Sequence, residues 1–196
     1  MNILKILYSA IFSPLQVING KKNEGKVLAS FIIVFITAFS GSVIAPTAYY
    51  FTFQDKYNLT FKFSSNLIMF CVSILTWLAA CSVLWLLSLF LKKEVRFMQI
   101  VSTWGLSYIP NLFCIVIYYG LQLKSEVLIT SEIVAFLINT VFILLLVWKV
   151  IYYFMEMKYV LKATVFELFI ITIIVGITFV CFMTVGSAVG IQVPML

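Results

Sequence analysis

The chain has 196 residues, of which 64% are hydrophobic and 10% are charged, whereas a soluble domain has roughly 45–50% apolar and about 25% charged residues. This composition excludes an ordinary soluble domain. The net charge is +6 and histidine is absent, which removes the commonest metal ligand and the commonest general base. Several apolar runs reach the roughly 18 residues that a membrane-crossing helix needs. We therefore predict an all-α integral membrane protein, a bundle of five transmembrane helices.

Residues 1–26 are predicted to form a cytoplasmic amphipathic segment that precedes the first span. Its apolar residues recur on one helical face, at Leu4, Leu7, Tyr8, Ile11 and Leu15, which is typical of a helix lying in the membrane interface. In the motif Phe12-Ser13-Pro14, a serine cap followed by proline marks a new helix start. Two short interfacial helices hinged at Ser13 are expected. Packing of the first turn on the bundle is the open alternative.

The transmembrane domain is predicted over residues 27–190, with an external tail at 191–196. Its five spans are expected at about 27–50, 66–91, 97–121, 132–154 and 163–190. The connecting segments are short, so no soluble domain is inserted between spans. Phe51–Ser65 is predicted as a loop and Met155–Lys162 as a turn.

The distribution of Lys and Arg predicts the orientation. One side of the membrane would carry ten of them: Lys5, Lys21, Lys22, Lys26, Lys92, Lys93, Arg96, Lys149, Lys158 and Lys162. The other side would carry three: Lys56, Lys62 and Lys124. Cytoplasmic loops are enriched in positive charge, so the N-terminus is expected inside and the C-terminus outside. The positive charge then faces anionic lipids of the cytoplasmic leaflet, and no nucleic-acid partner is expected.

Pro110 lies near the middle of the third predicted span. Proline lacks a backbone donor and clashes with the carbonyl four residues earlier, at Leu106. Thr103, Ser107 and Asn111 share one helical face at i, i+4 and i+8, and Tyr108 precedes the proline. We expect this polar stripe to face protein, because lipid cannot satisfy the freed groups. Two interpretations are open: a packing feature, or a partner or substrate site such as transporters build at broken helices.

Three other polar residues fall inside predicted spans. Asn139 is expected near mid-depth, either in an interhelical hydrogen bond or as a substrate contact. Glu167 is expected either to pair with Lys149 at the cytoplasmic interface or to act as a proton or ion relay. The sequence contains no recognised catalytic or nucleotide-binding motif. We expect no enzymatic activity, no catalytic residue, no metal and no cofactor.

Several short motifs resemble those of the Yip1 domain family, in the short form of bacterial members. They are Phe12-Ser13-Pro14, Tyr108-x-Pro110, Trp148 late in the fourth span, and Lys162-Ala163 before the fifth. The resemblance implies a scaffold or adaptor that binds other membrane proteins. It further implies an accessory or assembly role for an ABC-type exporter or toxin-protection system in a bacterial cell membrane.

Eukaryotic members of the Yip1 family bind small prenylated GTPases and each other, so GTPases would be the partners in a eukaryote. A homo-oligomer is also compatible with the resemblance. The alternative function is a small transporter or channel component that uses the proline-broken third span.

Overall fold

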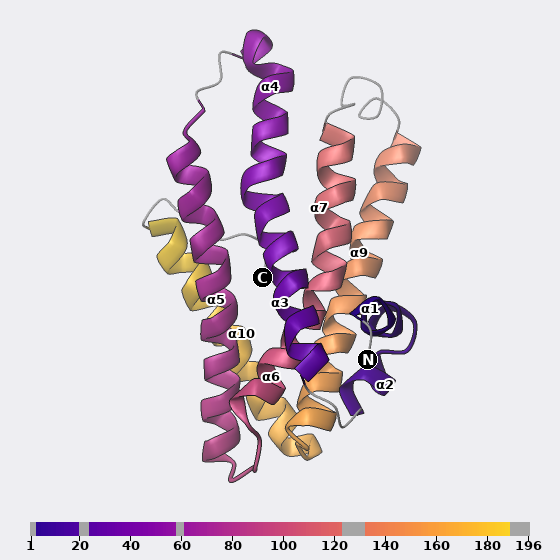
Figure 1. The fold of residues 1–196 in the computed structure, drawn as a ribbon, viewed down its shortest axis with the longest axis vertical. Coiled ribbons are helices and arrows are strands. Elements are labelled where there is room, and N and C mark those ends of the chain that lie inside the picture. Colours follow the sequence, from indigo (N-terminus) through magenta and orange to yellow (C-terminus); the bar gives the residue numbers. More distant parts are fainter. Residues whose placement is uncertain (1–2, 20–23, 58–60, 123–131, 189–196) are drawn as a thin grey trace.

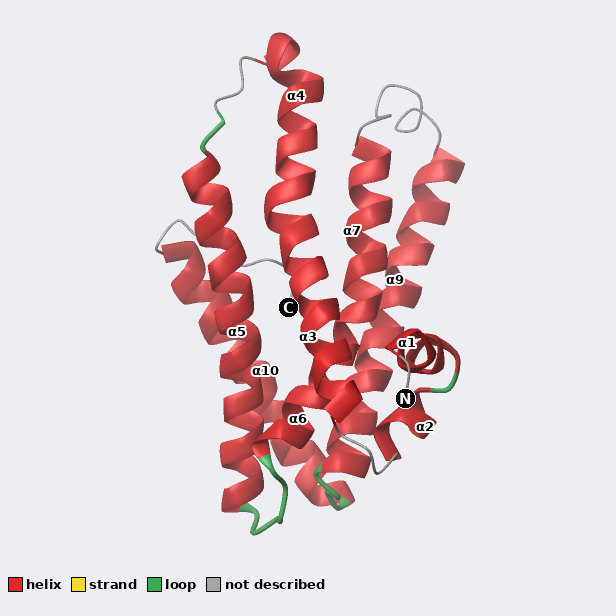
Figure 2. Ribbon diagram, viewed as in Figure 1, coloured by secondary structure: helices red, strands yellow, loops and turns green. Residues whose placement is uncertain are grey.

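The computed structural model describes residues 3–19, 24–57, 61–122 and 132–188, and within them every regular element is helical (Figure 2). Five helical stretches are long and apolar enough to cross a membrane. They are Gly25–Phe53, Phe63–Phe90, Phe97–Leu121, Val134–Val160 and Val165–Phe182. All five predicted spans therefore have a helix, although the tail at 191–196 lies outside the described residues.

The five spans stand side by side, and the third lies deepest among them (Figure 1). Two-thirds (67%) of its most apolar window is buried, against 6% for the fourth span and 11% for the fifth. The helices are α3 (Glu24–Phe39), α4 (Ala45–Tyr57), α5 (Phe63–Phe90), α6 (Phe97–Trp104), α7 (Ile109–Gln122), α9 (Glu132–Met155) and α10 (Val165–Ala188). The short helix α6 packs against α3 and α5, and α7 lies beside α9. The third span is therefore the element around which the others are arranged.

The third span breaks at the place where the sequence puts Pro110. A 3₁₀ turn, η2 (Gly105–Tyr108), separates α6 from α7, and Pro110 is the second residue of α7. Proline cannot donate to the Leu106 carbonyl, but the Ile109 N–H does so within the tighter turn. The predicted break is confirmed, and the 3₁₀ turn itself satisfies the carbonyl that the proline leaves free.

Gly105 brings the broken span into direct contact with the first span. A Cβ atom on Gly105 would lie 1.8 Å from Ser30 Oγ, 2.9 Å from Ser30 Cβ and 3.1 Å from the Ser30 carbonyl oxygen. The Ser30 hydroxyl donates a hydrogen bond of 2.6 Å to the Val101 carbonyl of α6. Only glycine fits where the two spans cross, because a Cβ atom at position 105 would overlap Ser30. Small residues of this kind let membrane helices approach closely.

The first span is longer than predicted. Its helix begins at Glu24 and continues to Tyr57, through the π-helical turn η1 (Ser40–Ile44), so the predicted loop begins too early. Pro46 is the second residue after this turn, and the Ala45 N–H donates to the Ser40 carbonyl five residues earlier. The π turn accommodates the proline without ending the helix. Within it, Gly41 lies close to Ile115 of α7.

The predicted turn at Met155–Lys162 is wrong over most of its length. Helix α9 continues into the π-helical turn η3 (Glu156–Val160), and a residue with positive φ, Lys162, ends it before α10. The helical face that begins in α9 is therefore prolonged by more than one turn. Glu156, expected in a loop, is instead buried in the bundle.

The N-terminal residues form two helices, α1 (Ile3–Phe12) and α2 (Pro14–Asn19), that meet at Ser13 as predicted. They pack on the bundle beside α3, α9 and η3, with Ile6, Ala10 and Val17 buried. The Tyr152 hydroxyl of α9 donates a hydrogen bond to the Ala10 carbonyl. One face of this segment therefore packs on the bundle, as the alternative interpretation expects. The opposite face exposes Tyr8 and Phe12.

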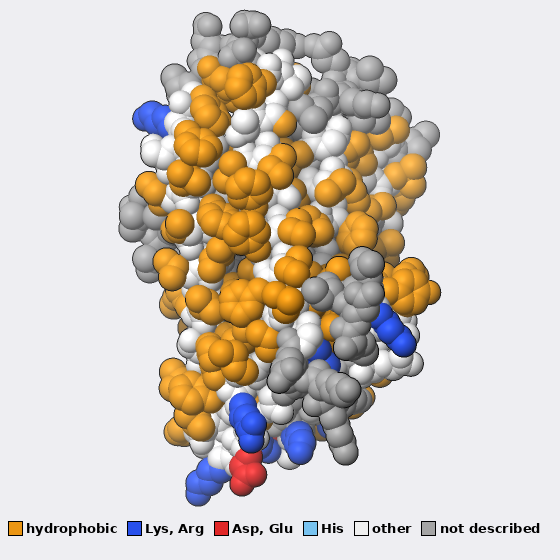
Figure 3. Space-filling view, viewed as in Figure 1, with side chains coloured by type: hydrophobic (Ala, Val, Ile, Leu, Met, Phe, Trp, Pro, Cys, Tyr) orange, Lys and Arg blue, Asp and Glu red, His pale blue; other side chains and the backbone are white. Residues whose placement is uncertain are grey.

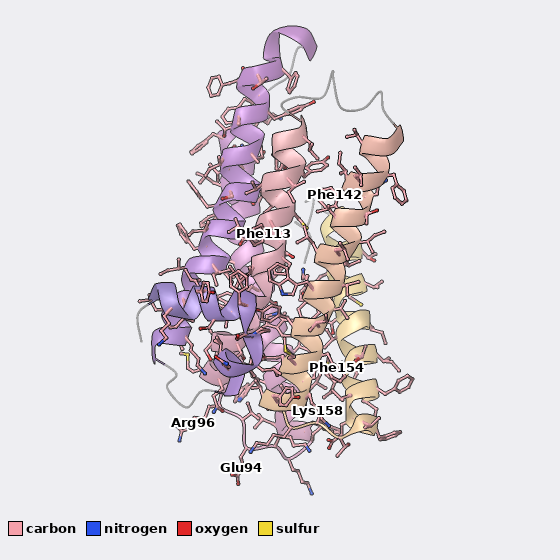
Figure 4. All side chains as sticks on the ribbon, turned by 90° about the vertical axis from the view of Figure 1, so that its right-hand side faces the viewer. Glu94, Arg96, Phe113, Phe142, Phe154 and Lys158 are labelled. Carbon is pink, nitrogen blue, oxygen red and sulfur yellow. The ribbon has the colours of Figure 1, made fainter. Side chains whose placement is uncertain are left out.

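Apolar side chains cover much of the face seen in Figure 3, and most of the charged side chains visible there gather at one end. Glu94 and Arg96 lie at this end, beside the turn between α5 and α6, and Lys158 of η3 lies near it (Figure 4). An apolar belt with charge at one end is the surface expected of a protein that spans a bilayer.

We predict that Gly105→Ala lowers the stability of the bundle by about 3 kcal/mol, because the new methyl group overlaps the Ser30 side chain. Thermal unfolding in detergent measures the change. Gly176→Ala is the matched control, since a Cβ there meets nothing within 4 Å. The control should leave stability unchanged or raised. Equal unfolding temperatures for the two variants would contradict the crossing described above.

Candidate functional site

The break in the third span collects buried polar side chains from several helices. Thr103, Ser107, Tyr108, Pro110 and Asn111 are all buried, so the predicted stripe faces protein. Together with Lys149, Tyr153 and Glu156 of the fourth span, the polar residues Thr103, Ser107, Tyr108 and Asn111 form what we call the polar cluster.

The hydroxyl groups of the stripe bond to backbone carbonyls of their own helix. The Ser107 hydroxyl donates to the Trp104 carbonyl at 2.7 Å, and the Thr103 hydroxyl lies 2.8 Å from the Gln99 carbonyl oxygen. The bond from Ser107 satisfies the Trp104 carbonyl, which lies directly before the 3₁₀ turn where the regular helical pattern fails. These contacts give the stripe a structural role in holding the broken helix.

Glu156 is the residue that the sequence analysis missed. Its carboxyl group is buried, with 2% of the residue exposed, and its Oε1 lies 2.5 Å from the Thr103 hydroxyl oxygen. The available signal was its position seven residues after Lys149, which places both on one face of a continuing helix. The signal was lost because the helix was expected to end at residue 154.

Lys149 is buried between aromatic rings. Only 4% of it is exposed, and its Nζ lies 5.7 Å from the Tyr108 ring centre and 5.6 Å from that of Tyr153. The Tyr153 ring in turn stacks on Trp104 at 4.4 Å with an interplanar angle of 8°. A cation over aromatic faces gains electrostatic energy, more so away from water. Lys149 is therefore a residue of the bundle interior, and its expected place on the cytoplasmic side stays a prediction.

Glu167 pairs with Lys93 and not with Lys149. Its Oε2 lies 3.0 Å from Lys93 Nζ and accepts a hydrogen bond of 2.6 Å from the Thr164 N–H. The Glu167 N–H approaches the Thr164 hydroxyl at 3.4 Å, which completes a capping box at the start of α10. The predicted ion pair exists with a different partner, and the carboxylate fixes where the last span begins.

Asn139 lies apart from the polar cluster. It is the eighth residue of α9, on the part of the helix far from Lys149, and its side chain is exposed. Its expected position at mid-depth in the membrane stays a prediction. Phe12 and Ser13 likewise lie apart: Phe12 is exposed and contacts the Tyr8 ring, while the Gln16 N–H donates to the Ser13 carbonyl where α2 begins after Pro14.

The polar cluster combines a buried amine with a buried carboxyl group on one face of α9–η3. Seven residues separate Lys149 from Glu156, about 10 Å along a helix. The Lys149 amine lies over the rings of Tyr108 and Tyr153, whereas the Glu156 carboxyl group contacts the Thr103 hydroxyl. Within the described ranges no group of three or more His, Cys, Asp or Glu could hold a metal ion. The cluster can join helices and can hold a proton.

We predict that Thr103→Val destabilises the protein by about 1–3 kcal/mol, because the buried Glu156 carboxyl group loses its hydroxyl partner. Glu156→Leu should lower stability less in the Thr103→Val variant than in the unmodified protein, since the two side chains form one interaction. Unfolding temperatures of the four variants in detergent measure the coupling. Thr178→Val is the control, because that hydroxyl bonds only the Ile174 carbonyl of its own helix. Strictly additive losses would contradict the interaction.

Comparison with known proteins gives no family to which this arrangement can be assigned. No protein-family model, no curated protein and no solved structure matches the chain. The conclusions about function therefore depend on the geometry of the bundle and on the motifs described above.

Proposed function

We propose that this protein is a non-enzymatic membrane adaptor that binds other membrane proteins within the bilayer. The observation that carries the proposal is Asn139, a polar side chain on the exposed surface of a membrane-spanning helix. An amide that faces hydrocarbon is unfavourable, and a hydrogen bond from a neighbouring helix compensates for it. The apolar neighbours Phe136 and Ile143 are also exposed. Asn139 therefore favours a protein partner on this side of α9.

The burial of the five spans supports the same proposal. The first three spans and η3 provide most of the described core, whereas most of α9 and α10 has no helix against its outer side within the part of the chain that the structure describes. Apolar burial provides no drive for helix association in lipid, so partner choice depends on shape and on polar groups. The fourth and fifth spans are thus the surfaces we assign to partners.

The motif resemblance adds the biological setting to the proposal. A Yip1-like adaptor in a bacterial cell membrane, with its N-terminus in the cytoplasm, would serve as an accessory or assembly factor for an ABC-type exporter or a toxin-protection system. The positive charge of the sequence supports this orientation. The exposed Tyr8, Phe12 and Lys5 of α1 then meet the cytoplasmic interface and its anionic lipids.

Photo-cross-linking in intact membranes tests the adaptor. A photoreactive amino acid in place of Ile143 should form an adduct with a membrane protein of defined mass, and Asn139→Leu should lower its yield about fivefold, as for loss of about 1 kcal/mol. Thr140→Val is the matched control, because the Thr140 hydroxyl bonds the Phe136 carbonyl of its own helix. Adducts with lipid alone would refute the proposal.

A proton-coupled transport component is the second candidate, favoured by the buried Lys149 and Glu156. Vesicles containing the purified protein and a pH-sensitive dye distinguish the two. The adaptor should conduct no more protons than empty vesicles. Proton flux that Lys149→Met abolishes and that Lys93→Met, near the surface, leaves intact would favour transport instead.

A further inference from the structure

The Thr103 hydroxyl stands between a backbone carbonyl and a carboxyl group. Its Oγ1 lies 2.8 Å from the Gln99 carbonyl oxygen and 2.5 Å from Glu156 Oε1. A second carbonyl oxygen, that of Ile100, lies 3.4 Å away. A hydroxyl group has one hydrogen to donate and can accept in addition, whereas a carbonyl oxygen can only accept. Both short contacts are therefore hydrogen bonds only if the hydroxyl donates to the Gln99 carbonyl and accepts a hydrogen from Glu156.

The burial of Glu156 favours the same protonation state. Only 2% of the residue is exposed. A buried carboxylate is costly unless a cation or several donors surround it. Within the described residues, the hydrogen-bond partner of this carboxyl group is the Thr103 hydroxyl. A neutral carboxylic acid needs an acceptor for its hydrogen, and this hydroxyl provides one.

Helices α2, α6, α9 and α10 pack against η3, and three of them offer Glu156 no counter-ion among the described residues. Neither α2 nor α6 contains an ionisable side chain. On α10, the Glu167 carboxylate pairs with Lys93 at 3.0 Å. In η3 itself, Lys158 and Tyr159 are exposed, whereas Glu156 faces inward. These elements therefore leave the buried carboxyl group without a direct positive neighbour.

Helix α9 and the neighbouring α5 carry the remaining titratable groups near Glu156. The Lys149 amine lies over the rings of Tyr108 and Tyr153, about 10 Å earlier along the helix. The Tyr152 hydroxyl donates to the backbone of α1. The buried Cys81 thiol of α5 lies near Glu156 and carries no positive charge. A neutral Glu156 is the form that fits all of these neighbours.

We propose that Glu156 binds a proton in the packed bundle and donates this hydrogen to the Thr103 hydroxyl. Two hydrogen bonds in series then join η3 to the α6 backbone, from Glu156 through Thr103 to the Gln99 carbonyl. The proton is thus a ligand that fastens the end of the fourth span to the broken third span. Glu156 opens a π-helical turn, an element that occurs frequently at functional sites. The inference is independent of the adaptor proposal, because a proton held here requires no partner on the outer side of α9.

Infrared spectroscopy of the purified protein in detergent at neutral pH tests the proposal. A carboxylic acid has its C=O stretching band at higher frequency than a carboxylate, and exposed Asp and Glu side chains are ionised at this pH. The wild type should show an acid band that Glu156→Gln removes. Glu167→Gln is the matched control and should leave the band, because that carboxylate pairs with Lys93. A wild-type spectrum without an acid band, or a band that Glu156→Gln leaves intact, would overturn the proposal.

The direction of the hydrogen bond is tested in the same spectra. Thr103→Val removes the acceptor, so the acid band should persist and shift to higher frequency. Thr103→Ser keeps a hydroxyl group and should leave the band near its wild-type position. This shift also assigns the band if Glu156→Gln fails to fold. A band that Thr103→Val leaves in place would show that Glu156 does not donate to Thr103.

A proton count on unfolding is an independent measurement. Guanidinium in weakly buffered detergent at neutral pH transfers Glu156 to water, where a carboxyl group is ionised. A pH-sensitive dye should report about one proton more per chain from the wild type than from Glu156→Gln. The comparison cancels the contribution of every other group, Lys149 included. Equal proton release from the two proteins would mean that Glu156 is already ionised in the bundle, and the proposal would fail.

Discussion

The contact between Gly105 and Ser30 is the constraint on which the rest of the bundle depends. Pro110 lacks the N–H that would bond the Leu106 carbonyl, and the third span passes through a 3₁₀ turn in which the Ile109 N–H bonds this carbonyl instead. All four residues of the turn are buried among the other helices. Because residue 105 is glycine, the third span lies close against Ser30 of the first span. The Ser30 hydroxyl bonds the Val101 carbonyl where the two spans cross. The break thus determines which span occupies the centre.

The buried charges of the fourth span follow from this arrangement. A lysine and a glutamate on one helix face would be costly against lipid, and the cost falls when they face polar groups and rings. The broken span provides both: the Thr103 hydroxyl meets Glu156, and the Tyr108 ring lies near Lys149. Removing one partner would leave a polar group buried without compensation, which costs more than the original interaction contributes. These two contacts therefore join the broken third span to the fourth span.

The sequence predicted the features that local chemistry determines and missed those set by packing. Apolar runs located five helices, and Pro110 located the break, because hydropathy and the missing donor act within one helix. The end of the fourth span was wrong because a π turn continues the helix past residue 155, and no local signal marks it. The partner of Glu167 was wrong because Lys93 lies in a turn more than seventy residues earlier, and only the fold brings them together. Glu156 was missed as a consequence of the first error.

Helix α9 presents two sides with different chemistry. One side holds Lys149 and Glu156 against the third span, while Asn139 lies exposed on the other. A helix is stiff about its axis, so a rotation imposed on the outer side would also turn the Lys149 amine against the Tyr108 and Tyr153 rings. Fluid lipid exerts no specific torque of this kind, whereas a packed helix would. A partner that favoured one rotation of α9 would therefore also favour one arrangement of the buried amine and carboxyl group.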